Sequence, residues 1–421
     1  EICERLDGMS LAIELAAARV RMLAPEQIRQ RLSQRFKLLR GQRRDLSDRQ
    51  ATLRGAIDWS WALLKPYEQS ALAQLSIFRG GCTLEAAEAV VDLADFEDEP
   101  WVMDTVEALV DHSLLRRSEP LAGHSRYRML ESVREYATQK LGDDAAPVAL
   151  RHAQYFATFG GRDFIDSLDT HGGVQRRQKL ALEMENLVAG VDGAIAASEW
   201  ELAGCCALAA TPNFEFKGPY LDGIALLNRV PTETLAPMLR ARSLSHSGRL
   251  LRLSGRIAEA LPLYEQAFDI ARKQGDRQFE GIFLTSLGLV HIEQGRSAEA
   301  LTIYEQTMAI ARELGDRASE GFVSTNLGLL HQNQGRSAEA LTHYERAIDI
   351  VREVGNRRHE GIVLANLGNL YKDQGRSAEA LTHYERAIDM AREVGNRRNV
   401  GVFLGNLGNF YKDQGRSAEA L

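Results

Sequence analysis

The carboxyl-terminal half of the chain repeats one pattern of apolar, small and polar positions at a fixed interval. GRIAEAL begins at Gly255, and GRSAEAL recurs at Gly295, Gly335, Gly375 and Gly415, a constant step of 40 residues. A period of about 20 to 50 residues is the signature of proteins built from stacked repeats. The pattern therefore predicts an array of equivalent units.

Each unit carries two stretches with apolar residues at helical spacing. NLGNLYKDQG, which ends at Gly375, predicts a first helix, and SAEALTHYERAIDMAREV, Ser377 to Val394, predicts a second. Gly375 and Gly395 can adopt the left-handed conformation that ends a helix. We expect Ser377 to cap the second helix, with Glu379 favourable near its positive end. Each unit is thus predicted to be one helical hairpin.

The positions where the two helices of a unit must cross are small or flat, and they closely resemble the tetratricopeptide signature. The resemblance covers roughly residues 238–421 and implies a right-handed α-solenoid of stacked hairpins. The unit is longer than the usual ~34 residues and lacks the closing proline, so we expect longer helices and a deeper groove. In one unit the matching residues are Leu367, Gly368, Tyr371, Gly375, Ala380, Tyr384 and Ala387.

Asparagines recur on the first helices, which line the concave face of such a solenoid. Asn326, Asn366 and Asn406 share one register, and Asn369 and Asn409 follow three residues later on the same face. Because Asn costs about 0.6 kcal/mol relative to Ala within a helix, its repeated use predicts amides that bind an extended protein or peptide. The arrangement resembles the ladders of kinesin light chains and spindle-orientation adaptors, which hold extended peptides. Alternatively, the amides only tie neighbouring hairpins together.

Two lysines could add positive charge to this predicted groove. Lys372 and Lys412 occupy one register of the first helices, where Gln332 and Ile292 stand in the earlier units. A complete set of cations that could clamp a carboxylate is therefore not present. A solvated helix face explains the lysines equally well.

Residues 1–143 have a different pattern, in which helices precede a short hairpin. Helical patterns begin at Lys65, Thr83 and Trp101, and the strand candidates SLLRRS and SRYRML are followed by the helical stretch ESVREYATQKL. This order predicts a mainly α chain with a winged helix over residues 49–143. Residues 1–48 would end a preceding helical subdomain, and residues 144–237 read as irregular hairpins bridging to the array over residues 238–421.

The amino-terminal motifs resemble the signal-transduction ATPases with numerous domains (STAND), in the part after their nucleotide-binding core. Residues 8–12 (GMSLA) resemble a Gly-Leu-Pro-Leu-Ala motif, which places Gly8 and Ser10 near the adenine. LVDHSLL and YRMLESVREYA resemble the winged-helix segments that hold the closed, ADP-bound state. The resemblance implies that the winged helix is an intramolecular latch on an upstream NTPase core. Ser10 replaces the family's proline and Leu130 its phosphate-sensing histidine, which puts ADP sensing by this wing in doubt.

Nucleotide hydrolysis is not expected of this chain. It contains no GxxxxGK[ST] stretch and no strand ending in paired acids, which phosphate and Mg²⁺ binding would require. We therefore expect no cofactor here, with ATP or ADP bound by a longer protein. The chain opens on Glu1 within a helical pattern and stops at Leu421 within a repeat, so we expect further sequence on both sides.

Charge weighs against nucleic-acid binding. The formal net charge is −7, whereas phosphate binding normally needs an excess of Lys and Arg on one surface. A basic stretch from Arg29 to Arg54 is interrupted by Asp45 and Asp48, and such stretches are usually solvated helix faces. A DNA-contacting winged helix nevertheless stays open as an alternative.

Metal binding and membrane insertion find no support in the sequence. No apolar run approaches the roughly 20 residues of a membrane helix. The cysteines form no CxxC pair and the histidines no HExxH motif, so we expect reduced thiols in a cytoplasmic protein and no metal site. The residues concerned are Cys3, Cys82, Cys205, Cys206, His152, His171 and His246.

These features favour the regulatory portion of a STAND-type signalling protein or transcriptional regulator, with a latch, a helical bridge and a repeat sensor for a protein or peptide. One alternative is a tetratricopeptide scaffold that assembles partners without nucleotide control. A weaker alternative is a winged-helix regulator that binds DNA.

Overall fold

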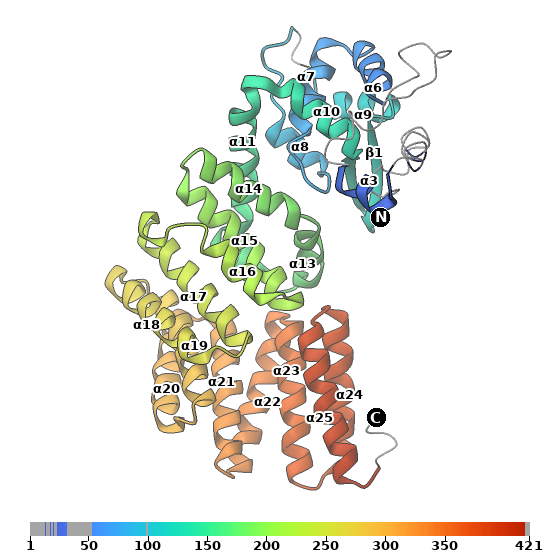
Figure 1. Cartoon of the computed structure of the whole chain (residues 1–421). Coiled ribbons are helices and arrows are strands. Elements are labelled where there is room, and N and C mark those ends of the chain that lie inside the picture. Colours follow the sequence, from blue (N-terminus) through green and yellow to red (C-terminus); the bar gives the residue numbers. More distant parts are fainter. Residues whose placement is uncertain are drawn as a thin grey trace. The chain divides into compact units, whose positions relative to one another are not determined.

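The computed structural model describes residues 13, 17, 20, 23–31, 53–97 and 100–416, and the chain divides into two compact units (Figure 1). The first comprises residues 1–155 with 192–197, and the second residues 156–191 with 198–421. Gly8, Ser10, Cys3 and most of the basic stretch between Arg29 and Arg54 lie outside the described residues.

The first unit has the order of helices and strands that the sequence predicts. Pro66 occupies the first turn of its helix, where a missing N–H is harmless, and the Thr83 hydroxyl accepts a hydrogen bond from the Ala86 N–H to begin the next helix. The elements are α3 (Pro25–Arg31), α6 (Leu53–Ala62), α7 (Pro66–Leu75), α8 (Leu84–Val90), α9 (Val102–Asp111), β1 (Leu115–Leu121), β2 (His124–Met129), α10 (Glu131–Leu141), the 3-10 turn η2 (Gly142–Asp144) and α11 (Ala145–Ala157).

The hairpin and the closing helix complete a winged-helix arrangement. Strands β1 and β2 pair antiparallel, with Arg117 opposite Tyr127. Relative to the predicted strands, β1 begins two residues later and β2 one residue earlier. Helix α10 packs on α7 and α6, and the Tyr136 hydroxyl donates a 2.6 Å hydrogen bond to Asp58. Leu130 precedes α10 and is half-buried.

The second unit begins with short helices that we call the bridge segment, residues 156–191 and 198–236. Its elements pack on one another and on the first helix of the array. They are η3 (Thr158–Gly160), α12 (Arg162–Ser167), α13 (Gly173–Leu182), α14 (Met184–Ala196, whose last residues belong to the first unit), α15 (Trp200–Lys217), α16 (Tyr220–Leu227) and η4 (Thr232–Thr234).

The array consists of long helices in successive hairpins, from α17 in yellow to α25 in red in Figure 1. First helices pack on the first helices of neighbouring hairpins, as α19 does on α21 and α21 on α23, so they line the inner side of the curve. The first helices are α17 (Pro237–Leu253), α19 (Arg277–Glu293), α21 (Arg317–Asn333), α23 (Arg357–Asp373) and α25 (Arg397–Asp413); the second helices are α18 (Ile257–Gln274), α20 (Ser297–Leu314), α22 (Ser337–Val354) and α24 (Ser377–Glu393).

The helix crossing in each hairpin depends on a glycine facing a tyrosine. A Cβ added at Gly368 would lie 2.8 Å from Cδ1 of Tyr384, and one at Gly328 would lie 2.6 Å from Cε1 of Tyr344. Both tyrosine side chains are fully buried. The expected roles of glycine and tyrosine at the crossing are therefore confirmed.

The expected cap at Ser377 is wrong. Ser377 is the first residue of α24, and the residue before it, Arg376, holds the capping position without a side-chain cap. The Arg376 guanidinium instead pairs with Glu379 in the first turn. The first helices do have side-chain caps: Asn356 and Asn396 each accept a hydrogen bond from the backbone N–H of the residue three positions later.

Candidate ligand-binding face of the repeat array

The candidate binding surface is the inner face of the first helices. We define it by three positions that recur in each first helix and are called registers below. These registers are half-buried in α17, α19, α21 and α23, as expected for side chains that border a groove. The inner face carries basic residues on α17, mainly apolar residues on α19 and α21, and asparagines with one apolar residue on α23 and α25. The residues are Arg242, His246 and Arg249; Ile282, Ser286 and Leu289; Phe322, Asn326 and Leu329; Ile362, Asn366 and Asn369; and Val402, Asn406 and Asn409.

Three asparagines of the predicted ladder share the central register of the inner face. Asn326, Asn366 and Asn406 are all half-buried. Among the described residues, none makes a hydrogen bond to their side-chain amides. Each amide keeps both a donor and an acceptor for a ligand.

Asn369 differs from them because its side chain is already engaged. Its Oδ1 accepts a 2.7 Å hydrogen bond from the hydroxyl of Tyr384, on the second helix of the same hairpin. In the preceding unit, Gln332 accepts the equivalent bond from Tyr344. Asn409 is exposed. At the second asparagine register, Asn369 thus forms a hydrogen bond within its own hairpin.

The lysines also differ from one another. The Lys372 ammonium lies 3.0 Å from Oδ2 of Asp413 in the next unit, so its charge is partly compensated. Arg252 makes the corresponding ion pair with Glu293 at 2.7 Å. Lys412 is exposed. Residues at this register therefore form ion pairs between neighbouring units.

The bridge segment covers the α17 end of the inner face. Glu215 of α15 is buried, and its Oε2 lies 3.2 Å from Nε of Arg249. Its Oε1 lies 3.4 Å from Nδ1 of His246. Arg242 donates a 2.6 Å hydrogen bond to the Gly160 carbonyl. All three inner-face residues of α17 therefore contact the protein's own chain.

The charges around Glu215 decide its ionisation. Burial alone would raise the pKa of this carboxyl, but Arg249, His246 and Arg358 outweigh burial and hold the pKa well below its usual value. In return, Glu215 raises the pKa of Arg249. Glu215 is therefore a buried carboxylate that is ionised in the folded protein.

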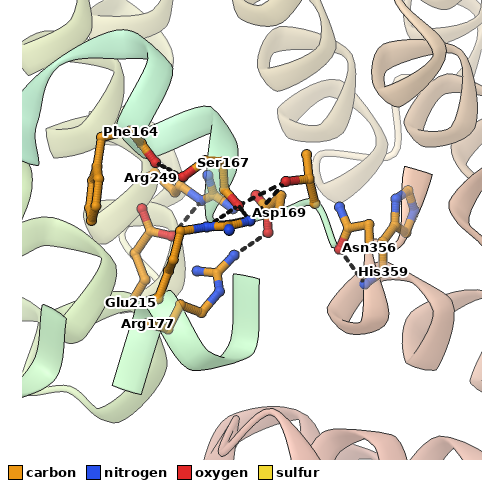
Figure 2. Close-up of polar contacts among 10 residues, drawn as sticks. Phe164, Ser167, Asp169, Arg177, Glu215, Arg249, Asn356 and His359 are labelled. Atoms are coloured by element: carbon orange, nitrogen blue, oxygen red, sulfur yellow. Dashed lines mark hydrogen bonds and ion pairs between the residues drawn. The ribbon is translucent and has the colours of Figure 1, made fainter. Parts of the chain in front are cut away.

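A second acid from the bridge segment joins the same cluster (Figure 2). Asp169 lies in the loop before α13 and pairs with Arg177. Burial raises the pKa of Asp169, whereas Arg177, Arg358 and Arg249 together lower it below its usual value. The Phe216 ring lies between two guanidinium groups, 4.4 Å from Cζ of Arg177 and 4.9 Å from Cζ of Arg358. The cluster connects the bridge segment with both α17 and α23.

The start of α23 is ordered by its own contacts. Asn356 and His359 face the Asp169 loop in Figure 2, and Asn356 accepts the His359 N–H at 3.0 Å. The His359 ring stacks on Phe322 with 3.9 Å between centroids, and Nε2 lies 3.0 Å from the Thr325 hydroxyl. Burial lowers the pKa of His359 to about 3, with Arg358 adding to the effect. His359 is therefore a neutral packing residue.

The sequence did not single out this charge cluster. Arg249 stands at an inner-face register where the next units have Leu289 and Leu329, and a charge at a half-buried position signals a partner. No spacing rule identifies that partner as Glu215 or Asp169, because the segments meet only through the fold.

Other side chains give no indication of chemistry in the described part of the chain. Cys82, Cys205 and Cys206 are thiols, and burial raises the pKa of Cys206. No group of three or more His, Cys, Asp or Glu that could hold a metal is found among the described residues. None of the helices described is long and apolar enough to cross a membrane.

Comparison with known families identifies both kinds of domain. A family model described as Tetratricopeptide repeat matches residues 239–313 and 321–393, and one described as Winged helix-turn-helix domain matches residues 64–142. The chain carries a winged helix-turn-helix domain and tetratricopeptide repeats. The predicted mainly α fold, with these two domain types in this order, is confirmed.

Curated relatives match part of this tetratricopeptide-containing chain. A Mycobacterium tuberculosis protein (strain H37Rv) whose name describes it as an HTH-type transcriptional regulator is 48% identical over 157 residues, 37% of this chain and 18% of that protein. An uncharacterised protein of the same strain is 40% identical over 158 residues, 37% of this chain and 40% of that protein. The chain thus matches less than half the length of either relative.

One solved structure is similar over nearly the whole chain. It is a STAND protein with a tetratricopeptide repeat sensor from Pyrococcus horikoshii, with a TM-score of 0.53 and 16% sequence identity, covering 97% of this chain and 57% of that one. At this identity the likeness shows the fold alone, and it agrees with the expected winged helix followed by a tetratricopeptide array.

Proposed function

We propose that this chain is the regulatory portion of a STAND-type signalling protein or transcriptional regulator, whose repeat array binds a protein or peptide along its inner face. The observation that carries the proposal is the central register of Asn326, Asn366 and Asn406, whose amides are half-buried and have no partner among the described residues. An amide that both donates and accepts can pair with the backbone of an extended chain.

The open part of the inner face supports the position of such a ligand. The bridge segment occupies Arg242, His246 and Arg249 of α17, whereas the ladder begins on α21. Apolar residues such as Leu329 and Ile362 border the amides and would pack against ligand side chains. Asn369, Asn409, Lys372 and Lys412 belong to the proposed ligand surface as flanking groups, although Asn369 and Lys372 also serve as internal ties.

In this proposal the winged helix is an intramolecular latch on an upstream NTPase core. The family resemblance of residues 109–115 and 127–137 supports this role. ATP or ADP would bind to that core, with Gly8 and Ser10 close to the nucleotide. The protein would act in the cytoplasm, and this chain alone would not hydrolyse ATP.

The composition of α9 supports a latch over a DNA-binding role. In helix-turn-helix proteins the second helix of the motif enters the major groove and needs donors to phosphates and base edges. Here α9 carries Asp104, Glu107 and Asp111 and no Lys or Arg. We expect the full chain to show no salt-sensitive binding to duplex DNA in an electrophoretic or anisotropy titration. Binding that α9 substitutions abolish would restore the DNA-binding alternative.

The ligand-binding proposal is tested by changing Asn366 and Asn406 together to Ala. A ligand is first selected from a peptide library and its affinity measured by titration calorimetry. Each lost amide leaves ligand backbone groups unpaired, at a cost of about 1–3 kcal/mol, so the double variant should bind at least about tenfold more weakly.

A matched control replaces the exposed Thr342 and Thr382 of the second helices with Ala, which should leave the affinity unchanged. Equal binding by the asparagine double variant and the wild type would reject the inner face as the binding surface. The alternative function, a scaffold without nucleotide control, would bind its partner on the same surface. An upstream sequence without a P-loop would favour the scaffold.

A further inference from the structure

A cavity of about 670 Å³ lies within the second unit, between the bridge segment and the start of α23. One wall is the loop Leu168–Gly173 with the first turn of α13, and the other is the turn from Gly355 to Glu360. Asp169 and Asn356, both labelled in Figure 2, line the two walls. The cavity is separate from the central register of the ladder.

Two helices, the short α13 and the long α23, begin at the walls of the cavity. Helix α13 starts at Gly173 and α23 at Arg357. Among the described residues, no acceptor is found for the backbone N–H groups of Val174 and Gln175 in the first turn of α13. The amino-terminal ends of helices attract anions through such free N–H groups and through the helix dipole.

Three of the four arginines that line the cavity are paired with carboxylates. Arg352 pairs with Glu360 at 2.9 Å, Arg357 with Glu360 at 2.8 Å, and Arg177 with Asp169. Arg358 differs from these three. In the described part of the chain no group accepts a hydrogen bond from its guanidinium, and its Nε is buried.

Within the described ranges, the surroundings of the Arg358 guanidinium supply no hydrogen-bond acceptor. Its guanidinium lies over the Phe216 ring, which supplies no oxygen. Burial and the nearby Arg249 lower the pKa of Arg358 to about 10, and the carboxylates of Asp169 and Glu215 only partly oppose this shift. A buried N–H donor such as Nε that has no acceptor destabilises the folded state, and more so when the group is charged. A group with oxygen acceptors and negative charge would remove that cost.

We propose that this cavity binds an oxyanion, a phosphate or carboxylate group of a small ligand, through the Arg358 guanidinium and the first turn of α13. The guanidinium presents a planar fork of N–H donors that matches either group. Because one wall belongs to the bridge segment and the other to the array, the bound anion would hold the two together. The ligand differs from the peptide of the inner face, and the inference does not depend on that peptide.

The test measures binding of sodium phosphate and of sodium succinate to the full chain by calorimetry, with thermal unfolding in parallel at matched ionic strength in sodium chloride. We expect saturable binding of at least one anion and a higher Tm in its presence. Phosphate binding alone identifies a phosphate ligand, and succinate binding alone a carboxylate ligand. If neither anion binds, the proposal is rejected.

Two variants locate the site. Arg358→Met should weaken binding at least about tenfold, because it removes a charge-assisted pair of hydrogen bonds. Gln175→Glu should also weaken it, because it places a negative charge at an exposed position of the first turn of α13. An acid near a helix start favours folding, so this second variant remains informative if Arg358→Met does not fold.

The matched control is Arg398→Met, at the equivalent position of the next first helix, where the arginine is exposed. It should bind the anion as the wild type does. Wild-type affinity in Gln175→Glu, or in a folded Arg358→Met, would overturn the assignment, as would an equal loss in Arg398→Met.

Discussion

Glu215 and Arg249 form an ion pair at 3.2 Å between α15 of the bridge segment and α17, the first helix of the array. The Glu215 side chain is 5% exposed and that of Arg249 35%. Removing one partner of such a pair leaves the other charge poorly solvated. The pair therefore contributes to holding the bridge segment on the inner face.

Glu215→Gln should destabilise the second unit at neutral pH by about 2 kcal/mol, because hydrogen bonds to charged groups contribute about 1.5–3 kcal/mol. The folded pKa of Glu215 lies below the unfolded value of about 4.3. The contribution of ionised Glu215 to the free energy of unfolding is therefore complete above the unfolded pKa and is lost as the pH falls through the folded pKa. Chemical unfolding from neutral pH to below about pH 4 measures both effects.

The variant should thus lose less stability on acidification than the wild type does. The exposed Glu233→Gln is the control and should follow the wild type. A Glu215→Gln protein with wild-type stability at neutral pH would show that the ion pair contributes nothing.

Gly368→Ala should destabilise the array, because the new methyl group would lie 2.8 Å from the buried Tyr384 ring. Overpacking of this kind costs about 1–3 kcal/mol, which exceeds the gain of up to about 1 kcal/mol from helix propensity. Gly401→Ala is the control within α25, since, apart from its chain neighbours and the nearby backbone of its own helix, no atom of a described residue lies within 4 Å of its added Cβ. It should be neutral or stabilising. Thermal unfolding checks both variants, and a loss of stability in Gly401→Ala alone would contradict the crossing geometry.

Asn366→Ala and Asn369→Ala should affect the ligand-free protein in opposite directions. Asn366 makes no hydrogen bond to another described residue, so its replacement should be neutral or stabilising by about 0.6 kcal/mol. Replacing Asn369 leaves the Tyr384 hydroxyl without its acceptor, at a cost of about 1–3 kcal/mol. Chemical unfolding of the two single variants separates these cases. Equal destabilisation would mean that both asparagines are structural ties.

The sequence by itself determined the repeat unit, because helical spacing and the exclusion of side chains at a crossing are local rules. The 40-residue pattern places Gly368 and Tyr384 at the helix crossing, where the structure shows them in contact, and the left-handed glycines Gly375 and Gly395 follow helix ends as expected. Local rules also failed once, because they place the cap of α24 at Ser377, whereas Ser377 is the first residue of that helix and Arg376 holds the capping position.

Only the tertiary structure decided which groups meet across the second unit. Asp169, Glu215, Arg249 and Arg358 lie far apart in the chain and share one cluster because the bridge segment packs against the first helices. Their ionisation follows from burial and mutual distance, which no sequence period encodes. The same packing covers the inner face at α17 and gives the Arg358 guanidinium no acceptor among the residues that the structure describes. Which groups cover a surface depends on the folded chain as a whole.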